Sequence, residues 1–369
     1  MTDQEYMMRA IGLAKQGLGW TSPNPLVGAV IVKDGRVIGE GYHERCGKLH
    51  AERNAIASLT ESAEGATLYV TLEPCCHYGK TPPCTEAILE QKIARVVIGS
   101  RDPNPLVAGK GAAILRAAGV RVEEDFMREE CDALNPVFFH YITKKTPYVV
   151  MKYAMTADGK IAARTGDSKW ITGESARKKV QELRHQNMGI MVGIGTVLAD
   201  DPMLNVRIPG LKSPVRIICD SGLRIPMDSK IVQTAKEYRT IVAYAGEHSG
   251  EGCKETEEKA EQLHAVGVET VSVPDAGGRV DLRKLMEYLG NQGIDSVLLE
   301  GGGTLNDAAL SAGIVNEICA FIAPKIFGGA GAKTPVSGIG VAHPAEAVML
   351  TLRQMETIGD DLMLRYSVD

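Results

Sequence analysis

The chain has 369 residues, of which 44% are hydrophobic and 24% are charged, so it has the composition of an ordinary globular protein with room for two domains. No run of about 18 apolar residues occurs, so we expect no membrane-spanning segment. The N-terminus does not resemble a signal peptide, and eight cysteines are too few for a disulfide scaffold, so we expect a cytoplasmic protein with reduced thiols. The net charge of −5 argues against a large nucleic-acid-binding surface and is compatible with a small anionic substrate.

Helix and strand patterns alternate through the first 145 residues. Apolar residues between positions 7 and 13 fall near helical spacing, and this first helix is expected to end at Gly17. Residues 26–43 predict a β-hairpin that turns at Asp34-Gly35. After the hairpin we expect a helix at 49–60, a strand at 66–72, a helix at 84–93, a strand at 94–103, a helix at 109–119, a short strand at 120–125 and a helix from about 128 to 145. This alternation predicts a mixed α/β sheet with helices on both faces.

The sequence KKTP at 144–147 is the best candidate for a domain boundary. The pattern restarts there with an apolar strand at 147–156 and a turn at 157–160. Further apolar segments of α/β units lie at 189–193, 214–220, 239–245, 268–273, 296–303 and 317–329. The polar stretch 247–262 is expected to be an exposed connection that leads into a helix. We therefore expect two α/β domains, residues 1–145 and 146–369.

One His-x-Glu motif and two separated cysteines predict a metal site in the first domain. His50 opens a helix, Cys75 follows a strand, and Cys84 opens the next helix. One imidazole and two thiolates can bind a tetrahedral zinc ion and leave a fourth position for water, whose pKa zinc lowers to about 7. Glu52 follows His50 closely enough to carry protons from that water to a leaving amine without being a ligand.

The order of these motifs matches the signature of zinc deaminases, H-x-E followed by P-C and a second cysteine. The second cysteine comes later than usual here, because the segment CHYGKTPP at 76–83 separates Cys75 from Cys84. Two prolines restrict the chain just before Cys84, so that residue can still begin a helix while the insertion loops over the pocket. Either motif alone is common without a metal, but both together, in this order and on these element ends, form a specific signal.

Two glycine-rich segments of the second domain, 192–207 and 298–310, each lie where a strand gives way to a helix. Glycines at such a turn let the backbone approach a phosphate, and the start of the helix favours anions. Neither segment contains the G-x-G-x-x-G fingerprint of dinucleotide-binding Rossmann folds. By themselves these residues indicate either a phosphate-binding turn or an ordinary tight turn.

Motifs along the whole chain resemble one known family. In the first half these are TSPNPLVGAVIV, HAERNAI and EPCCHYGKTPPC, and in the second half MKYAMTADGKIA, SKWITG, DSGLRIP, LLEGGGTLN and IAPKIFGG. They resemble the bifunctional deaminase–reductase of riboflavin biosynthesis, the RibD/RibG family. The resemblance implies a cytidine-deaminase-like α/β/α domain followed by a dihydrofolate-reductase-like α/β domain that binds NADPH with a glycine turn. It also implies deamination of 2,5-diamino-6-ribosylamino-4(3H)-pyrimidinone 5′-phosphate to the uracil, and then NADPH-dependent reduction of the ribosyl group to a ribityl chain.

The same resemblance implies the site residues. The zinc ligands would be His50, Cys75 and Cys84, while Glu52 moves protons and Cys76 is a neighbour that does not bind the metal. The deaminase substrate would contact Asn24, His43, His77, Lys80 and Asn104. NADPH would contact Ala154, Trp170, Thr196, Asp200, Ser221, Gly301, Gly302, Gly303 and Thr304. The reductase substrate would contact Ser168, Arg184, Leu204, Arg207 and Glu300.

Chemistry favours some of these roles and leaves others open. Lys80 is a cation in a Gly/Thr/Pro loop, which makes it the most natural phosphate partner of the first domain. The guanidinium groups of Arg184 and Arg207 suit a phosphate, although a surface ion pair is the alternative for each. Asn24 and Asn104 each stand between prolines and are equally compatible with turns.

The proton donor of the reduction is not decided by the sequence. Lys152 and Glu300 are both candidates, because each lies on an apolar strand where an idle charge would be costly. We take Lys152 as the catalytic residue.

Two other functions compete with this interpretation. A tRNA-type nucleic-acid deaminase fused to an unrelated reductase would need a basic groove, which fits poorly with a net charge of −5. A non-catalytic zinc module attached to a lone reductase would not need Glu52. We expect a small phosphorylated pyrimidine as the partner, neither nucleic acid nor membrane, and a homo-oligomer, which the family's pattern favours.

Overall fold

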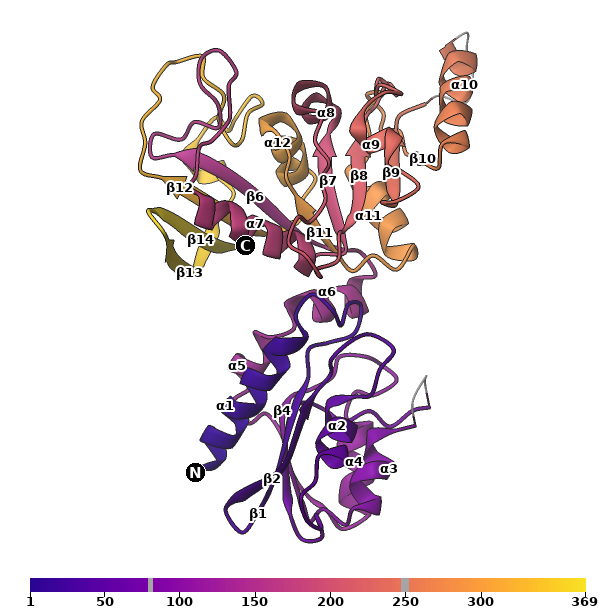
Figure 1. The fold of residues 1–369 in the computed structure, drawn as a ribbon, viewed down its shortest axis with the longest axis vertical. Coiled ribbons are helices and arrows are strands. Elements are labelled where there is room, and N and C mark those ends of the chain that lie inside the picture. The colour runs from indigo at the N-terminus through magenta and orange to yellow at the C-terminus, as the bar shows by residue number, and fades with distance from the viewer. Residues whose placement is uncertain (79–81, 247–251) are drawn as a thin grey trace. The chain divides into compact units, whose positions relative to one another are not determined.

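The computed structural model describes residues 1–78, 82–246 and 252–369. The chain divides into two compact units, Met1–Lys145 and Thr146–Asp369, each with its own sheet (Figure 1). Within the described residues, no helix combines the length and the apolar character that crossing a membrane requires.

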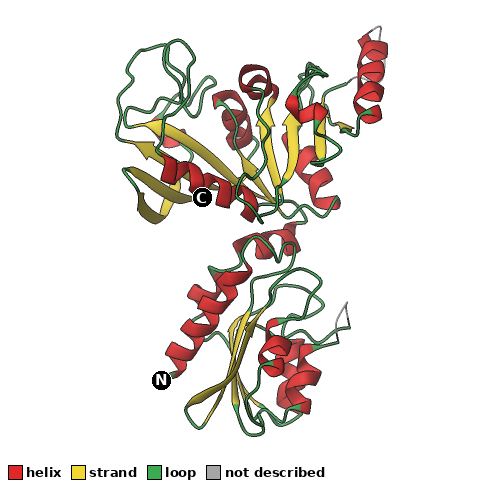
Figure 2. Ribbon diagram, viewed as in Figure 1, coloured by secondary structure: helices red, strands yellow, loops and turns green. Residues whose placement is uncertain are grey.

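The first unit is a five-stranded sheet with helices on both faces (Figure 2). Its strands are β1 (Gly28–Lys33), β2 (Arg36–Tyr42), β3 (Thr67–Leu72), β4 (Arg95–Ser100) and β5 (Arg121–Glu123), in the sheet order β2-β1-β3-β4-β5. Strand β1 runs antiparallel to β2 and β3, whereas β3, β4 and β5 are parallel. Its helices are α1 (Asp3–Ala14), continued by a 3₁₀ turn (Lys15–Gly17), α2 (Ala51–Ala57), α3 (Cys84–Glu90), α4 (Lys110–Ala117), α5 (Arg128–Asp132) and α6 (Pro136–Lys144).

Local sequence signals explain how this unit begins. Thr2 and Glu5 form a capping box at the start of α1, in which each side chain accepts a hydrogen bond from the other residue's backbone N–H. The predicted hairpin forms between β1 and β2, and its turn residues Asp34 and Gly35 have φ angles of 50° and 73°. These positive φ angles match the two-residue turn that follows the right-handed twist of the strands.

Two apolar layers hold the helices on the sheet. Met7 and Ile11 of α1 pack on one face with Val30 and with Cys131 of α5. Helices α2, α3 and α4 cover the other face, where residues such as Leu115 are fully buried. This arrangement confirms the predicted α/β/α layers.

The single helix predicted from about 128 to 145 is wrong, because the chain forms α5 and α6 there. Pro136 begins α6, and a proline disfavours the helical conformation of the residue before it. Asn135 accordingly leaves the helical region, with φ −127° and ψ 35°. Its buried side chain bonds both the N–H and the carbonyl of Leu26, at 2.7 and 2.8 Å, and so fixes the start of the β1 segment.

The second unit contains a nine-stranded sheet in the order β10-β9-β8-β7-β11-β6-β12-β14-β13. The strands are β6 (Tyr148–Thr156), β7 (Gly189–Gly193), β8 (Val215–Cys219), β9 (Thr240–Tyr244), β10 (Glu269–Ser272), β11 (Ser296–Leu299), β12 (Val315–Ala323), β13 (Leu350–Ile358) and β14 (Asp361–Val368). The helices are α7 (Glu174–Gln186), α8 (Ile194–Asp200), α9 (Lys230–Gln233), α10 (Gly252–Ala265), α11 (Leu282–Asn291) and α12 (Gly303–Ser311), followed by a 3₁₀ turn (Pro344–Glu346). In this sheet order, neighbouring strands are parallel from β10 at one edge as far as β12. The hairpin of β14 and β13 then completes the sheet in antiparallel orientation.

Two parts of this unit differ from the prediction. The C-terminal hairpin was not predicted, although Gly359-Asp360 between two strand-like runs is a hairpin signal. Helix α10 takes up most of the stretch 247–262 that we expected to be a connection, and residues 247–251 lie outside the described part of the chain.

One fully buried arginine organises part of the second unit. Arg216 on β8 is 0% exposed, and burial lowers its pKa to about 10. Its guanidinium donates to three backbone carbonyls, those of Met203 at 3.3 Å, Ile231 at 2.8 Å and Tyr238 at 3.1 Å. It also donates to the hydroxyls of Thr234 and Thr240. Because all five groups are neutral, the arginine acts as a multivalent hydrogen-bond donor that fastens the loop after α8 to β8 and β9.

We predict that Arg216→Met destabilises the second unit by about 3 kcal/mol or more, because it leaves several buried carbonyls unpaired. Denaturant unfolding of the purified variant, monitored by circular dichroism, measures this change in the free energy of unfolding. Arg279→Met is the matched control, since Arg279 is exposed and its loss should change the free energy of unfolding by less than about 0.5 kcal/mol. Equal stability of the two variants would contradict the role given to Arg216.

Candidate active sites

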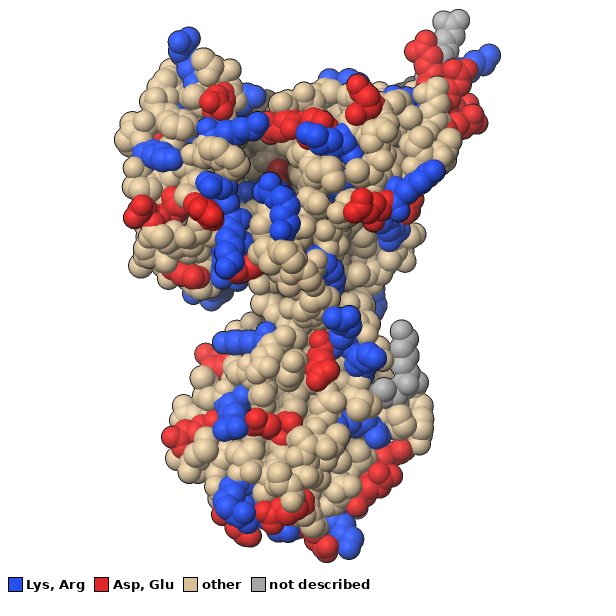
Figure 3. All heavy atoms as spheres, in the orientation of Figure 1, with Lys and Arg blue, Asp and Glu red and all other residues tan. Residues whose placement is uncertain are grey.

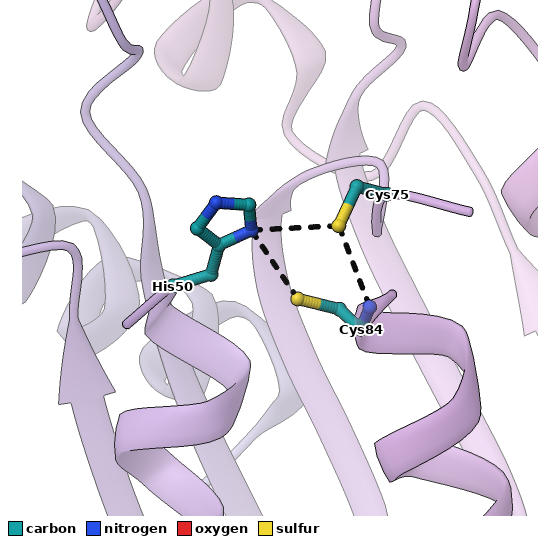
Figure 4. Close-up of side chains that lie close together, drawn as sticks. All are labelled: His50, Cys75 and Cys84. Atoms are coloured by element: carbon teal, nitrogen blue, oxygen red, sulfur yellow. Dashed lines mark hydrogen bonds between the residues drawn. The ribbon is translucent and has the colours of Figure 1, made fainter. Parts of the chain in front are cut away.

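The three predicted metal ligands meet where one strand end and two helix starts converge. His50 immediately precedes α2, Cys75 follows β3, and Cys84 is the first residue of α3. His50 Nδ1 lies 3.4 Å from the Sγ of Cys75 and 3.4 Å from the Sγ of Cys84 (Figure 4). The donor atoms all lie within 4.8 Å of one another. Tetrahedral zinc with bonds of about 2.0–2.3 Å needs its ligand atoms about 3.5 Å apart, so this donor set fits zinc.

Hydrogen bonds position the late second cysteine. The backbone N–H of Cys84 donates to Cys75 Sγ at 3.4 Å. Arg53 on α2 donates to the carbonyl of Pro82 at 3.1 Å and to that of Pro83 at 2.8 Å. The end of the inserted segment is therefore fastened to the helix that follows His50, which lets the unusual spacing still produce a three-ligand cluster.

Burial sets the charges at this cluster. Glu52 is 4% exposed, and burial raises its pKa to about 7, so this carboxyl can both take up and release a proton near neutral pH. Hydrogen bonds from the Cys84 thiol and from His50 lower the pKa of Cys75 to about 4. The bond to Cys75 in turn raises the pKa of Cys84. The cluster therefore already holds thiolate character at Cys75, the form of cysteine that binds a metal.

A cavity of about 310 Å³ opens beside the ligands. Its wall includes Asn24, His43, Cys46, Lys48, His50, Glu52, Glu73, Cys75, His77, Asp102, Asn104 and Phe138. His43 is 2% exposed, and burial lowers its pKa. Its Nδ1 lies 2.9 Å from the carbonyl of Leu49 and therefore carries the proton, so its Nε2 accepts from the Asn24 amide at 3.2 Å. The pair leaves the Asn24 amide oxygen as an acceptor for a ligand.

The other predicted contacts of this pocket divide into three cases. His77 lies in the wall, and its buried Nδ1 has no hydrogen-bond partner within the described residues, as expected for a group that binds a ligand. Asn104 also lies in the wall, but its side chain accepts from the N–H of Leu106 at 3.1 Å and so holds a turn. Lys80 lies outside the described residues. Cys76 donates to the carbonyl of Leu106 at 3.7 Å and is not part of the ligand cluster.

Asp102 is one of the titratable residues of this wall that the sequence interpretation did not assign to the site. Asp102 is 8% exposed, and burial raises its pKa to about 6. Its carboxylate accepts from the N–H of Asn104 at 2.8 Å. The signal was present in the motif DPNP, where an acid shortly after a buried strand stands two residues before Asn104.

The predicted NADPH contacts gather at one edge of the second sheet. Strands β8, β7, β11 and β6 are adjacent and parallel, so their carboxyl ends share an edge. Ala154 lies near the end of β6, Thr196 and Asp200 lie on α8 after β7, and Ser221 follows β8. Gly301 to Thr304 follow β11. Open parallel sheets bind ligands outside these strand ends, and Figure 3 shows a hollow in the second unit with both Lys/Arg and Asp/Glu side chains around it.

The glycine turn before α12 leaves one face open. A Cβ at Gly301 would lie 2.8 Å from the Asn306 side-chain oxygen, and one at Gly303 would lie 2.8 Å from the Thr334 carbonyl. A Cβ at Gly302, the N-cap of α12, would meet nothing within 4 Å. Close packing therefore requires two glycines, and the third leaves room for a phosphate at the start of the helix. These residues fit a nucleotide cofactor.

Glu300 joins two predicted site cations in a buried cluster. Arg184 contacts both of its carboxylate oxygens, at 2.7 and 3.2 Å, and Lys152 Nζ lies 3.2 Å away. Burial alone would raise the pKa of Glu300, but the charges of Arg184 and Lys152 outweigh it and bring the pKa to about 2. Arg184 thus forms a buried ion pair in place of the surface pair considered from the sequence, and its contact with a substrate phosphate stays a prediction.

The remaining predicted residues of the second unit have varied surroundings. Arg207 is exposed, and its guanidinium has no partner within the described part of the chain. Leu204 is 4% exposed and belongs to the core between the sheet and α9 and α10. Trp170 is 61% exposed, with the Arg177 guanidinium 4.3 Å from its ring centre, and Ser168 nearby in sequence is half-buried.

Comparisons with known proteins agree in both halves. Residues 147–364 match the RibD C-terminal domain, and residues 1–100 match the cytidine and deoxycytidylate deaminase zinc-binding region. The riboflavin biosynthesis protein RibD of Actinobacillus pleuropneumoniae is 58% identical over 368 residues, which cover 100% of this chain and 96% of that protein. The chain belongs to the RibD family. Aquifex aeolicus RibD is 43% identical, with 99% of this chain and 98% of that protein covered.

Solved structures of RibD proteins have the same fold. Acinetobacter baumannii RibD superposes with a TM-score of 0.87 and 37% identity, covering 100% of this chain and 99% of that one. The Thermotoga maritima diaminohydroxyphosphoribosylaminopyrimidine deaminase/5-amino-6-(5-phosphoribosylamino)uracil reductase gives a TM-score of 0.86 and 38% identity, with coverages of 99% and 98%. RibD membership confirms the predicted cytidine-deaminase-like and reductase folds.

We predict that Cys84→Ser and Cys75→Ser each reduce the bound zinc from about one ion per chain to nearly none, because a set of only three protein ligands loses a thiolate. Metal analysis of the purified chains measures this stoichiometry. Cys76→Ser is the matched control and should keep its zinc, since its thiol contacts the Leu106 carbonyl instead of the cluster. Loss of zinc from Cys76→Ser would show that the ligand set is wrong.

Proposed function

We propose that this RibD-family chain catalyses two successive steps of riboflavin biosynthesis. The first is deamination of 2,5-diamino-6-ribosylamino-4(3H)-pyrimidinone 5′-phosphate to the uracil, and the second is reduction of the ribosyl group to a ribityl chain. The observation that carries this proposal is the convergence of His50, Cys75, Cys84 and Glu52 at a pocket, in one chain with a RibD reductase domain. We assign residues 1–145 to the deaminase and 146–369 to the reductase. The cofactors are Zn²⁺ and NADPH.

In the deaminase, the chain's own residues hold the pyrimidine and move protons. Zinc, when bound, makes a water molecule acidic enough to attack the pyrimidine ring at neutral pH. Glu52 takes the proton of that water and delivers it to the nitrogen that leaves as ammonia, a task suited to its pKa of about 7. Asn24, His43 and His77 bind the substrate, supported by the fixed Asn24–His43 pair and by the unpartnered His77 Nδ1. Lys80 and Asn104 complete the proposed contacts.

In the reductase, a buried ion cluster lies beside the proposed cofactor site. NADPH, when bound, supplies a hydride to C1′ of the ribosyl group. We assign its binding to Ala154, Trp170, Thr196, Asp200, Ser221 and Gly301 to Thr304, and substrate binding to Ser168, Arg184, Leu204, Arg207 and Glu300. Lys152 donates the proton that the opening ribose ring needs, and ionised Glu300 holds its Nζ in place at 3.2 Å. Arg207, whose guanidinium is exposed, is the better of the two arginines for the phosphate.

A tRNA-type deaminase joined to an unrelated reductase is not favoured. Both halves match RibD proteins along their full length, and the second half would have no role in that alternative.

Separate assays of the two steps test this function. We predict that Glu52→Gln lowers deamination by at least about 100-fold while it retains zinc and reduces preformed deaminated substrate normally. Lys152→Met should show the reverse, with normal deamination and lost NADPH oxidation. A chelator should also stop deamination and leave the reduction of preformed deaminated substrate unchanged. Wild-type protein that deaminates tRNA alone, or a Glu52→Gln variant with unchanged turnover, would refute the proposal.

We also propose a cytoplasmic homo-oligomer that acts on small molecules. All seven cysteines whose state is described are free thiols, as expected in a reducing compartment. Strand β13 is at the edge of the second sheet and exposes apolar side chains, including Leu352 at 54% and Met355 at 67%. Exposed apolar edge strands favour pairing with another chain, which supports a second copy at this edge.

Light scattering of the purified protein tests this assembly. We expect a mass of at least two chains for the wild type and a shift toward one chain for Met355→Lys, which places a charge on the edge. Ile114→Lys, at a similarly exposed apolar position on α4, is the control and should keep the wild-type mass. A single-chain mass for the wild type would contradict the proposal.

A further inference from the structure

Helix α4 has no cap of its own. The residue before it is Gly109, which has a φ of 76° and no side chain to bond the first N–H groups of the helix. The carboxylate of Glu73, at the end of β3, supplies this cap from a distance in sequence. One oxygen accepts from the N–H of Gly109 at 2.9 Å, and the other accepts from the N–H of Ala112 at 3.2 Å. In an ordinary capping box two side chains satisfy these two donors, but here one buried carboxylate satisfies both.

The same helix start also contacts the residues on either side of Cys75. A Cβ at Gly111 would lie 2.2 Å from the carbonyl oxygen of Pro74, so α4 approaches this turn as closely as its backbone allows. On the other side, the thiol of Cys76 donates to the carbonyl of Leu106, in the loop that leads into α4. The turn that presents Cys75 to the metal is therefore contacted before the ligand by the start of α4 and after the ligand by the loop that leads into α4.

We propose that Glu73 is a positioning residue for zinc, which, together with Gly111, holds Cys75 in ligand geometry through α4. Glu73 is 4% exposed, and within residues 1–78, 82–246 and 252–369 no hydrogen bond or ion pair joins its carboxylate to a metal donor or to a cation, so its two bonds to backbone N–H groups satisfy the buried carboxylate. The carboxylate also carries a favourable charge for the N-terminus of α4. Because the pocket residues Asp102 and Asn104 lie on the loop that enters the same helix, the bonds from Glu73 to the start of α4 also help to fix this part of the pocket wall.

The rate at which the protein loses zinc tests this positioning role without depending on enzyme turnover. Glu73→Gln keeps the size of the side chain but replaces one acceptor with an N–H₂ group, so one of the two helix bonds is lost. Gly111→Ala places a Cβ against the Pro74 carbonyl. We expect both variants to transfer zinc to a chromophoric chelator about 10-fold faster than the wild type, the low end of effects seen for supports of metal ligands. Cobalt-substituted protein should show a changed thiolate-to-metal absorption band, and reduction of preformed deaminated substrate should be unchanged.

Helix α1 offers matched controls on the other face of the same sheet. Glu5→Gln removes an equivalent capping carboxylate, and Gly12→Ala adds a Cβ that meets nothing within 4 Å. Both should transfer zinc at the wild-type rate. Leu115→Ala lowers the stability of α4 from its buried side and controls for general destabilisation.

Wild-type zinc transfer in folded Glu73→Gln would overturn the inference, as would equally fast transfer from Leu115→Ala at a matched melting temperature. If Gly111→Ala does not fold, the isosteric Glu73→Gln decides alone. Wild-type protein that holds zinc but deaminates nothing would refute the proposed function and leave this inference standing.

Discussion

The deaminase site depends on a cluster of hydrogen bonds around one sulfur, the Sγ of Cys75. It lies 3.4 Å from the imidazole of His50 and accepts from the backbone N–H of Cys84 at the same distance. The hydrogen bond from the Cys84 thiol, together with the contacts to His50 and to the Cys84 N–H, lowers the pKa of Cys75 to about 4 and so favours a thiolate inside a largely buried corner. A buried anion is costly without partners, and a divalent cation is the partner that this donor set fits. The orientation of α2 and α3, and hence of Glu52, follows from this convergence.

In the reductase unit, a buried carboxylate is stabilised by cationic side chains. Glu300 stays ionised because Arg184 contacts both its oxygens and Lys152 approaches one of them. Desolvation of such a cluster offsets much of its attraction, so it is weak evidence for stability and better evidence for function. Its place next to the glycine turn of α12 puts a fixed charge and a proton donor beside the proposed cofactor.

Helix starts are the recurring structural element of both units. His50 and Cys84 lie at the starts of α2 and α3, Glu73 caps α4, and the glycine turn opens α12. The unpaired N–H groups of a helix start need acceptors, and in the first unit Cys75 Sγ accepts from the first N–H of α3 while the Glu73 carboxylate accepts at the start of α4. At α3 and α4, capping and the presentation of a metal ligand therefore constrain the same residues.

The sequence by itself determined the α/β class, the boundary near Lys145 and most elements. It also determined the candidate metal ligands His50, Cys75 and Cys84 and the candidate proton carrier Glu52. These features are legible because periodicity, turn residues and metal-ligand types are local signals. It did not predict the break before Pro136 or the C-terminal hairpin, although both carried local signals. Only the tertiary structure decided that Arg184 pairs with Glu300, that Asp102 enters the pocket wall, and that Glu73 caps a helix that begins more than thirty residues later. These contacts join residues far apart in the chain, and a residue's type alone does not specify which distant donor or charge folding will bring to it.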